Sequence, residues 1–209
     1  MSKIILALDT TDVNKALEIT KKIKDKIFTI KIGLEMWNSF GKDGVKKFNQ
    51  IGINNIFLDL KLADVSNTIR KSILALDGIN FEYLTVHSFG GSEMIKKAKE
   101  AAKQLNPNLK VIAVTVLTSI NEKELKSMQI NNNVEDLVLN LAKNSIEADG
   151  FVASGIESKM LRGNFPKHLL FSPGIRMPNE DKHDQKRVVS PAEALKYSDY
   201  IIMGRSLMT

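Results

Sequence analysis

The chain has 209 residues, of which 43% are hydrophobic and 26% charged, with a formal net charge of +6. This balance predicts one globular domain over residues 1–209, and no apolar run reaches the ~18 residues of a membrane span. The chain has no cysteine and no signal-peptide pattern, and its positive charge comes largely from lysines in helical patterns, so we expect a cytoplasmic protein without disulfides, membrane contacts or nucleic acid.

Apolar runs that end in charged or polar residues recur along the chain and predict buried parallel strands. We expect about eight, at residues 3–8, 28–33, 55–61, 83–87, 109–116, 150–153, 168–172 and 200–203. Helical patterns separate them, at residues 13–23, 45–50, 66–76, 92–104, 122–128, 134–148, 157–161 and 192–197. Asp12 is placed to cap the first helix, and Pro191 suits the start of the last.

Strands that alternate with helices are typical of a (β/α)₈ barrel, although a doubly wound open sheet has the same repeat. The barrel is favoured by polar residues at or just after the carboxyl ends of the strands. They are Asp9, Lys31, Asp59, Lys61, His87, Thr118, Arg176 and Arg205. In a barrel these positions surround one mouth, where barrel enzymes have their active sites. The sequence therefore predicts an α/β TIM barrel.

The third strand ends in three charges of alternating sign, Asp59, Lys61 and Asp64. Because side chains alternate along a strand, Asp59 and Lys61 point to the same face. Charges at the end of an apolar strand are costly unless they pair or face a cleft. A surface salt bridge is the simpler interpretation of this pattern alone, so a catalytic role depends on the residues around it.

The last two strands are followed by Pro173-Gly174-Ile175-Arg176 and Gly204-Arg205-Ser206. Barrel enzymes often bind phosphate at these two strand ends, where glycine lets the backbone approach the anion and arginine adds a bidentate donor. A turn with a surface arginine would explain Gly204-Arg205 alone. Arg176 and the long polar loop at 177–190, a length associated with lids or binding, favour a phosphate site.

The three histidines give no metal signal. His87 follows a strand and is better explained as a packed, hydrogen-bonded side chain than as a general base. His168 and His183 have no partners at ligand spacing, so we predict no metal site.

Taken in order, the motifs of the chain resemble the orotidine 5'-phosphate decarboxylase family. The motifs are Leu8-Asp9, Lys31-Ile32-Gly33, Asp59-x-Lys61-x-x-Asp64 with Asn67-Thr68, Val86 to Gly91, Val114 to Ser119, Ser172 to Arg176, Asp184-Gln185 and Gly204-Arg205. Each motif alone is weak. The ordered set runs from the first strand to the last and is highly specific.

The resemblance implies that a homodimer without a cofactor decarboxylates orotidine 5'-monophosphate to UMP and CO₂, in de novo pyrimidine synthesis. It implies that Lys61 protonates C6 of the pyrimidine, and that Lys31, Asp59 and Asp64 complete an alternating charge network. Asp64 and Thr68 would reach the partner's site. The other implied substrate contacts are Asp9 and Lys31 at the ribose, Thr118 and Ser119 beside the base, and Arg176, Gln185, Gly204 and Arg205 at the phosphate.

The chain departs from the family pattern at two places. Ser66 stands where family members often have proline, and we expect this loop change to be tolerated. The chain ends at Thr209, soon after Gly204, whereas the family usually adds a final helix. We therefore expect a barrel that lacks this helix.

Two other functions compete with this interpretation. Sister enzymes on the same barrel, a 3-keto-gulonate-6-phosphate decarboxylase or a hexulose-phosphate synthase, share Asp59-x-Lys61-x-x-Asp64 but use Mg²⁺. The motifs at Leu117-Thr118-Ser119 and 173–185 are not expected in them. A non-catalytic nucleotide-binding barrel would keep the phosphate residues and lose the charge network, which is intact in this sequence.

Overall fold

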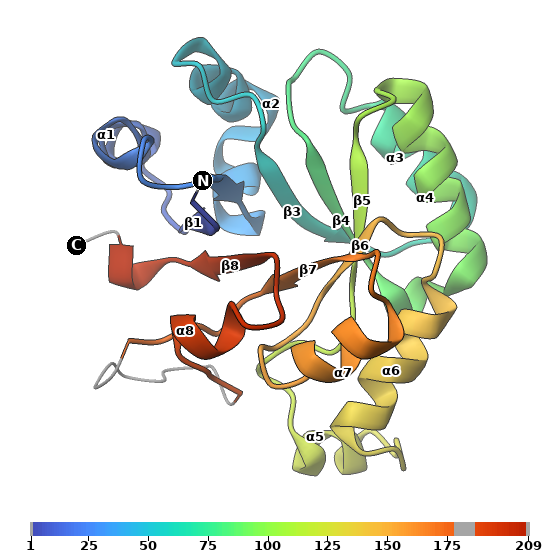
Figure 1. Cartoon of the computed structure of the whole chain (residues 1–209). Helices are drawn as coiled ribbons and strands as arrows, with labels where there is room; N and C mark the ends of the chain where they lie inside the picture. Colours follow the sequence, from blue (N-terminus) through green and yellow to red (C-terminus); the bar gives the residue numbers. More distant parts are fainter. Residues whose placement is uncertain (1, 178–186, 208–209) are drawn as a thin grey trace.

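A computed structural model describes residues 2–177 and 187–207, in which eight parallel strands close into a barrel (Figure 1). Strands β1 and β8 complete the ring, with Ile4 opposite Ile201 and Leu6 opposite Met203. The predicted (β/α)₈ barrel is confirmed and the open-sheet alternative is wrong. The strands are β1 (Ile4–Leu8), β2 (Thr29–Ile32), β3 (Phe57–Leu62), β4 (Tyr83–His87), β5 (Lys110–Val114), β6 (Gly150–Val152), β7 (Leu169–Ser172) and β8 (Tyr200–Met203).

Helices surround the barrel on its outside (Figure 1). They are α1 (Val13–Ile23), α2 (Leu34–Gln50), α3 (Ser66–Leu74), α4 (Gly91–Leu105), α5 (Glu122–Ser127), α6 (Val134–Asn144), α7 (Ser158–Asn164) and α8 (Pro191–Ala194). Within the described part of the chain, β8 is followed by the 3₁₀ turn η2 (Arg205–Leu207) and by no α-helix. None of the described helices is long and apolar enough to cross a membrane.

The helix between β2 and β3 begins much earlier than the sequence pattern indicates. We expected helical structure at 45–50, whereas α2 begins at Leu34 and is kinked at Gly41, where φ is +52°. The kink interrupts the helical period of the apolar residues, which explains why only the second part was recognised. In the other direction, α6 ends at Asn144 rather than at 148, because the chain turns at Ser145, whose N–H bonds the carbonyl of Ala142.

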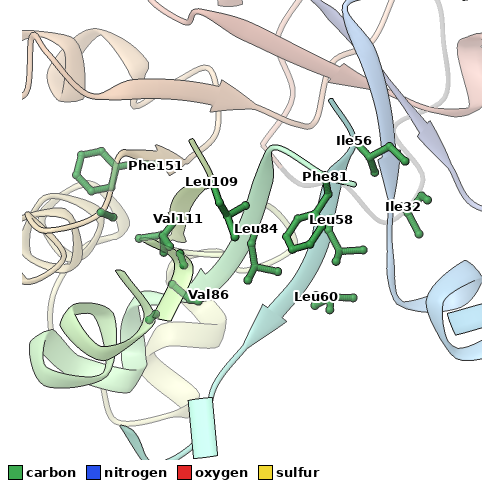
Figure 2. Packing of buried hydrophobic residues seen from close by; sticks show 14 of the residues in the cluster. Ile32, Ile56, Leu58, Leu60, Phe81, Leu84, Val86, Leu109, Val111 and Phe151 are labelled. Atoms are coloured by element: carbon green, nitrogen blue, oxygen red, sulfur yellow. The ribbon is translucent and has the colours of Figure 1, made fainter. Parts of the chain in front are cut away.

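Apolar side chains fill both sides of the barrel wall. Figure 2 shows residues of neighbouring strands, among them Leu58, Leu84 and Val111, which are fully buried in the layer shared with the helices. Inside the barrel, the rings of Phe57 and Phe171 lie 5.0 Å apart. The rings of Tyr83 and Tyr200 pack against Phe171 at 5.3 and 5.2 Å. These aromatic residues fill the barrel below its mouth.

The aromatic residues fill the inside of the barrel up to the layer in which polar side chains begin to point inward. Because side chains alternate along a strand, Phe57 and Asp59 both point inward, with Asp59 one layer nearer the carboxyl ends of the strands. The same step separates Tyr83 from Thr85 on β4. Charged groups of this layer therefore rest on an apolar base rather than on water.

Candidate active site

A cavity of about 270 Å³ opens at the carboxyl ends of the strands. Its walls come from six of the strands, from connections that follow them and from the connection after β7, so residues far apart in the sequence meet there. Eight predicted site residues line it: Asp9, Lys31, Asp59, Lys61, Thr118, Ser119, Arg176 and Gly204. Apolar side chains such as Val116, Val152 and Ile202 form other parts of the wall. This mixture suits a ligand that has both apolar and charged parts.

Four charged side chains form a chain of alternating sign along one wall of the cavity. The Nζ atoms of Lys61 and Lys31 lie 2.8 and 3.1 Å from Oδ2 of Asp59. Lys31 Nζ also lies 3.8 Å from Oδ1 of Asp9. The Asp59 side chain is 9% exposed, whereas that of Lys61 is 32% exposed and borders the cavity. Lys61 therefore presents its ammonium group to whatever fills the cavity.

The neighbouring lysines keep Asp59 ionised. Burial alone would raise the pKa of the Asp59 carboxyl, but attraction to Lys31 and Lys61 outweighs burial and lowers it to about 2. Burial would lower the pKa of Lys31, yet attraction to Asp59 and Asp9 raises it above its ordinary value. The pair Asp59–Lys31 is thus fully charged at neutral pH, and the field it produces is fixed before any ligand binds.

The backbone of β3 leaves the regular strand geometry where these charges lie. Leu58 faces Leu84 of β4, but the next paired residues are Leu62 and Val86, so β3 has two more residues than β4 between these pairs. Lys61 has a positive φ of +47° within this bulge. The sequence analysis placed Asp59 and Lys61 on one face, and their contact agrees with this. It gave no sign of the bulge, because no glycine marks it.

The other end of the cavity is formed by the connections after β7 and β8. Gly174 has a φ of +73°, a conformation that favours glycine, and both Gly174 and Gly204 line the cavity. A bridge between Ile175 and Val189 closes the base of the β7–β8 connection, because Arg176 N–H donates to the carbonyl of Val189. Gln185 lies outside the described residues, and of Arg205 only the backbone is described.

A buried ion pair joins this connection to the neighbouring strand ends. Arg187 Nη1 bonds Oε1 of Glu157, and both side chains are less than a tenth exposed. Arg187 Nη2 donates to the carbonyl oxygens of Val116 and Leu117, each at 3.0 Å. Arg187 thus holds the backbone just before Thr118, one of the predicted base contacts. The sequence analysis did not single out either member of this pair.

Two predicted site residues lie outside the cavity of this chain. Asp64 and Thr68 are exposed, and Asp64 forms no ion pair with any described residue. The Oδ1 atom of Asp64 accepts a hydrogen bond from the N–H of Val65 at 2.7 Å. The geometry of a single chain therefore joins Asp9, Lys31, Asp59 and Lys61 and leaves Asp64 facing outward.

Both described histidines pack against aromatic rings, as was expected of His87. The ring of His87 lies 5.4 Å from that of Phe89 and does not line the cavity. Burial and the nearby Lys61 charge lower the pKa of His87. His168 stacks on Phe151 with ring centroids 5.0 Å apart. His183 lies outside the described residues. Among the described residues, no group of three or more His, Asp or Glu side chains is arranged to hold a metal.

Comparisons with known proteins agree on one family. The model of the orotidine 5'-phosphate decarboxylase / HUMPS family matches residues 2–209. Proteins named orotidine 5'-phosphate decarboxylase from Fusobacterium nucleatum and Buchnera aphidicola are each 39% identical, over 98 and 99% of this chain and 88 and 89% of their own lengths. The crystal structure of the Lactobacillus acidophilus enzyme of that name superposes with a TM-score of 0.85 at 34% identity, covering 100% of this chain and 92% of the other.

The lowered pKa of Asp59 predicts an acid-dependent contribution to stability. In the unfolded chain this pKa is about 4, whereas in the folded chain it is about 2. Between these pH values the unfolded chain binds more protons, so the stabilising contribution is complete above about pH 4 and is lost as the pH falls toward 2. We expect Asp59→Asn to be less stable than wild type at neutral pH, with a difference that shrinks by roughly 1 kcal/mol near pH 3.

Urea unfolding at both pH values measures this difference. Asp43→Asn is the matched control, because the Asp43 side chain is 88% exposed and its Lys46 partner is 3.5 Å away. Exposed pairs of this kind contribute little. A stability difference for Asp59→Asn that stayed constant with pH would contradict the assigned ion pairs.

Proposed function

The chain belongs to the orotidine 5'-phosphate decarboxylase / HUMPS family, and we propose that it decarboxylates orotidine 5'-monophosphate to UMP and CO₂. The observation that carries the proposal is the cavity itself. One wall holds the chain Asp9–Lys31–Asp59–Lys61, and the other end is built from Gly174, Arg176 and Gly204. As a lyase of this kind, the protein acts in de novo pyrimidine biosynthesis in the cytoplasm.

The proposed chemistry centres on Lys61. When the bond between C6 and the carboxylate carbon breaks, CO₂ leaves and the electron pair remains on C6 of the pyrimidine. This carbanion is poorly delocalised, so a nearby positive charge stabilises the transition state. The ammonium group of Lys61 supplies that charge and then donates a proton to C6, forming UMP. Solvent returns a proton to the Lys61 amine, which is 32% exposed.

Asp59 and Lys31 hold the ammonium group of Lys61 in place. Asp59 Oδ2 bonds Lys61 Nζ at 2.8 Å, which fixes the direction of the proton donor. Lys31, at 3.1 Å from the same oxygen, balances part of the Asp59 charge and contacts the ribose together with Asp9. No metal ion takes part in this scheme, because an ammonium group provides both the stabilising charge and the proton.

The phosphate of the nucleotide is held at the ends of β7 and β8. Gly204 borders the cavity there, where a Cβ atom would lie 3.5 Å from Oδ2 of Asp9. Arg176 lines the same end. Gln185 and the Arg205 side chain lie outside the described part of the structure, and the resemblance to the family implies that they also contact the anion. Thr118 and Ser119 lie in the wall beside the base. Binding energy from a remote phosphate can orient the reacting base, which raises turnover as well as affinity.

The active site is shared between two copies of the chain. Asp64 and Thr68 are exposed in one chain and serve the site of the partner. This proposal is supported by exposed apolar side chains at the ends of three adjacent strands: Leu34 after β2, Val65 after β3 and Phe89 after β4. A two-fold dimer interface at this surface would bury these side chains, and Asp64 and Thr68 of each chain would then reach the site of the other chain.

If the proposed activity is correct, the absorbance of orotidine 5'-monophosphate should fall when the nucleotide is added to the purified protein. We expect full turnover in the presence of EDTA, because the proposed charge stabilisation comes from Lys61. The assay is run with EDTA, with Mg²⁺, and with 3-keto-gulonate-6-phosphate as an alternative substrate. Activity that is abolished by EDTA and restored by Mg²⁺ would instead identify a sister enzyme of the family.

If Lys61 is the proton donor, its removal should lower kcat more than the removal of an ordinary catalytic acid would. Lys61→Ala should lower kcat by more than the ~10²–10⁴-fold typical of a single acid–base group, because Lys61 also stabilises the carbanion. Binding of UMP, measured by calorimetry, should change far less. Lys22→Ala removes an exposed helical lysine and serves as the control. A Lys61→Ala enzyme with more than about a tenth of wild-type turnover would exclude Lys61 as the donor.

The shared site predicts complementation between two inactive variants. Lys61→Ala and Asp64→Ala chains are mixed after dissociation and allowed to re-form dimers. Half of the dimers are then mixed, and each mixed dimer contains one complete site of two, so activity should recover to roughly a quarter of wild type.

A second mixture serves as the control, because it combines variants of two residues that belong to the same chain's site. Lys61 and Asp59 belong to the same chain's network, so Lys61→Ala mixed with Asp59→Ala leaves both sites broken and should recover nothing. Subunit exchange is verified with differently tagged chains. If exchange occurs and Lys61→Ala with Asp64→Ala also recovers nothing, each site is built from one chain.

A further inference from the structure

Because of the bulge in β3, the N–H of Lys61 has no backbone acceptor on β4. Between the paired residues Leu58–Leu84 and Leu62–Val86, β3 does not follow the regular ladder with β4. The N–H of Lys61 lies in this interval. A buried N–H without an acceptor costs about as much as a lost hydrogen bond, so a replacement is needed.

The replacement is the hydroxyl group of Thr85, which lies on β4. Lys61 N–H donates to Thr85 Oγ1 at 2.8 Å. This contact supports a backbone conformation that is unusual for lysine, because φ is +47° and residues with a Cβ atom disfavour this region. The hydrogen bond therefore offsets part of the cost of turning the Lys61 backbone.

The same hydroxyl group also bonds the carboxylate beside Lys61. Thr85 Oγ1 donates its proton to Oδ1 of Asp59 at 3.0 Å, and Thr85 is fully buried. A hydroxyl has one proton, so the donor and acceptor roles of Thr85 are both assigned by these two contacts. Asp59 is consequently held at both oxygens, with Thr85 at Oδ1 and the ammonium groups of Lys31 and Lys61 at Oδ2.

We propose that Thr85 is a positioning residue for the decarboxylation, through one hydroxyl group that fixes the Lys61 backbone and the Asp59 carboxylate together. Thr85 does not line the cavity. It acts by holding the proton donor and its carboxylate partner in one arrangement before the nucleotide binds. The inference rests on the proposed function, because it assigns Lys61 to proton transfer.

Thr85→Val tests the proposal, because valine keeps the shape of threonine and removes the hydroxyl group. We expect kcat on orotidine 5'-monophosphate to fall about 10- to 100-fold, the effect of losing one or two hydrogen bonds to charged or strained groups. KM should change less than about threefold, because the phosphate and ribose contacts remain. Thr85→Ser keeps the hydroxyl group and should retain most of kcat.

Thr20→Val is the matched control for a purely structural effect. Thr20 is also fully buried, and its Oγ1 donates to the carbonyl of Ala16 at 2.8 Å, on α1 and away from the cavity. This variant should lose stability and keep the wild-type kcat. If Thr85→Val has a wild-type kcat, or if Thr85→Ser loses as much as Thr85→Val, the positioning role is excluded. Should Thr85→Val not fold, Thr85→Ser against Thr85→Ala gives the same contrast.

A measurement without substrate separates this inference from the proposed function. The Asp59 carboxyl pKa, followed by ¹³C NMR in wild type and Thr85→Val, should be higher in the variant, because the carboxylate loses a donor. An unchanged pKa would contradict the contact. If wild type does not turn over orotidine 5'-monophosphate, the proposed function fails, and the NMR result alone decides whether Thr85 holds Asp59.

Discussion

The contact on which the rest of the site depends is the one between the Asp59 carboxylate and two ammonium groups, at 2.8 and 3.1 Å. Asp59 and Lys31 would each be costly at this depth if they stood alone, because their side chains are 9 and 12% exposed and the layer below them is apolar. The lysines compensate for the burial of Asp59, and Asp59 compensates for theirs. The charges are therefore stable only as a group, and the group presents Lys61 to the cavity.

The barrel contributes to this arrangement through what lies beneath and beside it. The aromatic residues under the mouth keep water away from one side of Asp59, which strengthens its attraction to Lys31 and Lys61. The bulge in β3 turns the Lys61 backbone, and Thr85 on the adjacent strand supports the turned peptide. Charge, packing and backbone geometry thus meet at one strand end, and none of the three would produce the same site alone.

The fold could be predicted from the sequence because it depends on patterns that are local. Apolar runs such as 3–8 and 200–203 alternate with helical patterns, a repeat that a barrel shares with an open sheet, and the polar residues at the ends of these runs favoured the barrel. The charged residues of the site could be predicted because Asp59 and Lys61 are two positions apart on one strand. The supporting contacts could not be predicted in this way. Thr85 is one of two threonines in the described strands, and nothing in the sequence of β3 predicts the bulge on which its proposed role depends.

A second group of residues was missed for a different reason. Glu157 and Arg187 are ordinary charged residues in the sequence, separated by α7, β7 and a long connection, and the closed barrel brings them together. Likewise, the beginning of α2 was hidden by the kink at Gly41, which breaks the spacing of the apolar residues. In each case the missing information is a contact between distant segments or a local break in periodicity.

The buried pair of Glu157 and Arg187 limits how this barrel can change during evolution. A substitution of one member leaves the other as an unpaired buried charge, at a cost of about 3–5 kcal/mol, a large part of the stability of a typical domain. Replacement of both by apolar residues can be nearly neutral. Arg187 also holds the carbonyl groups of Val116 and Leu117, so such a double replacement would release the backbone before Thr118. Lineages that keep the cavity wall at Thr118 are therefore expected to keep both charges, whereas substitutions should accumulate on the outer helices.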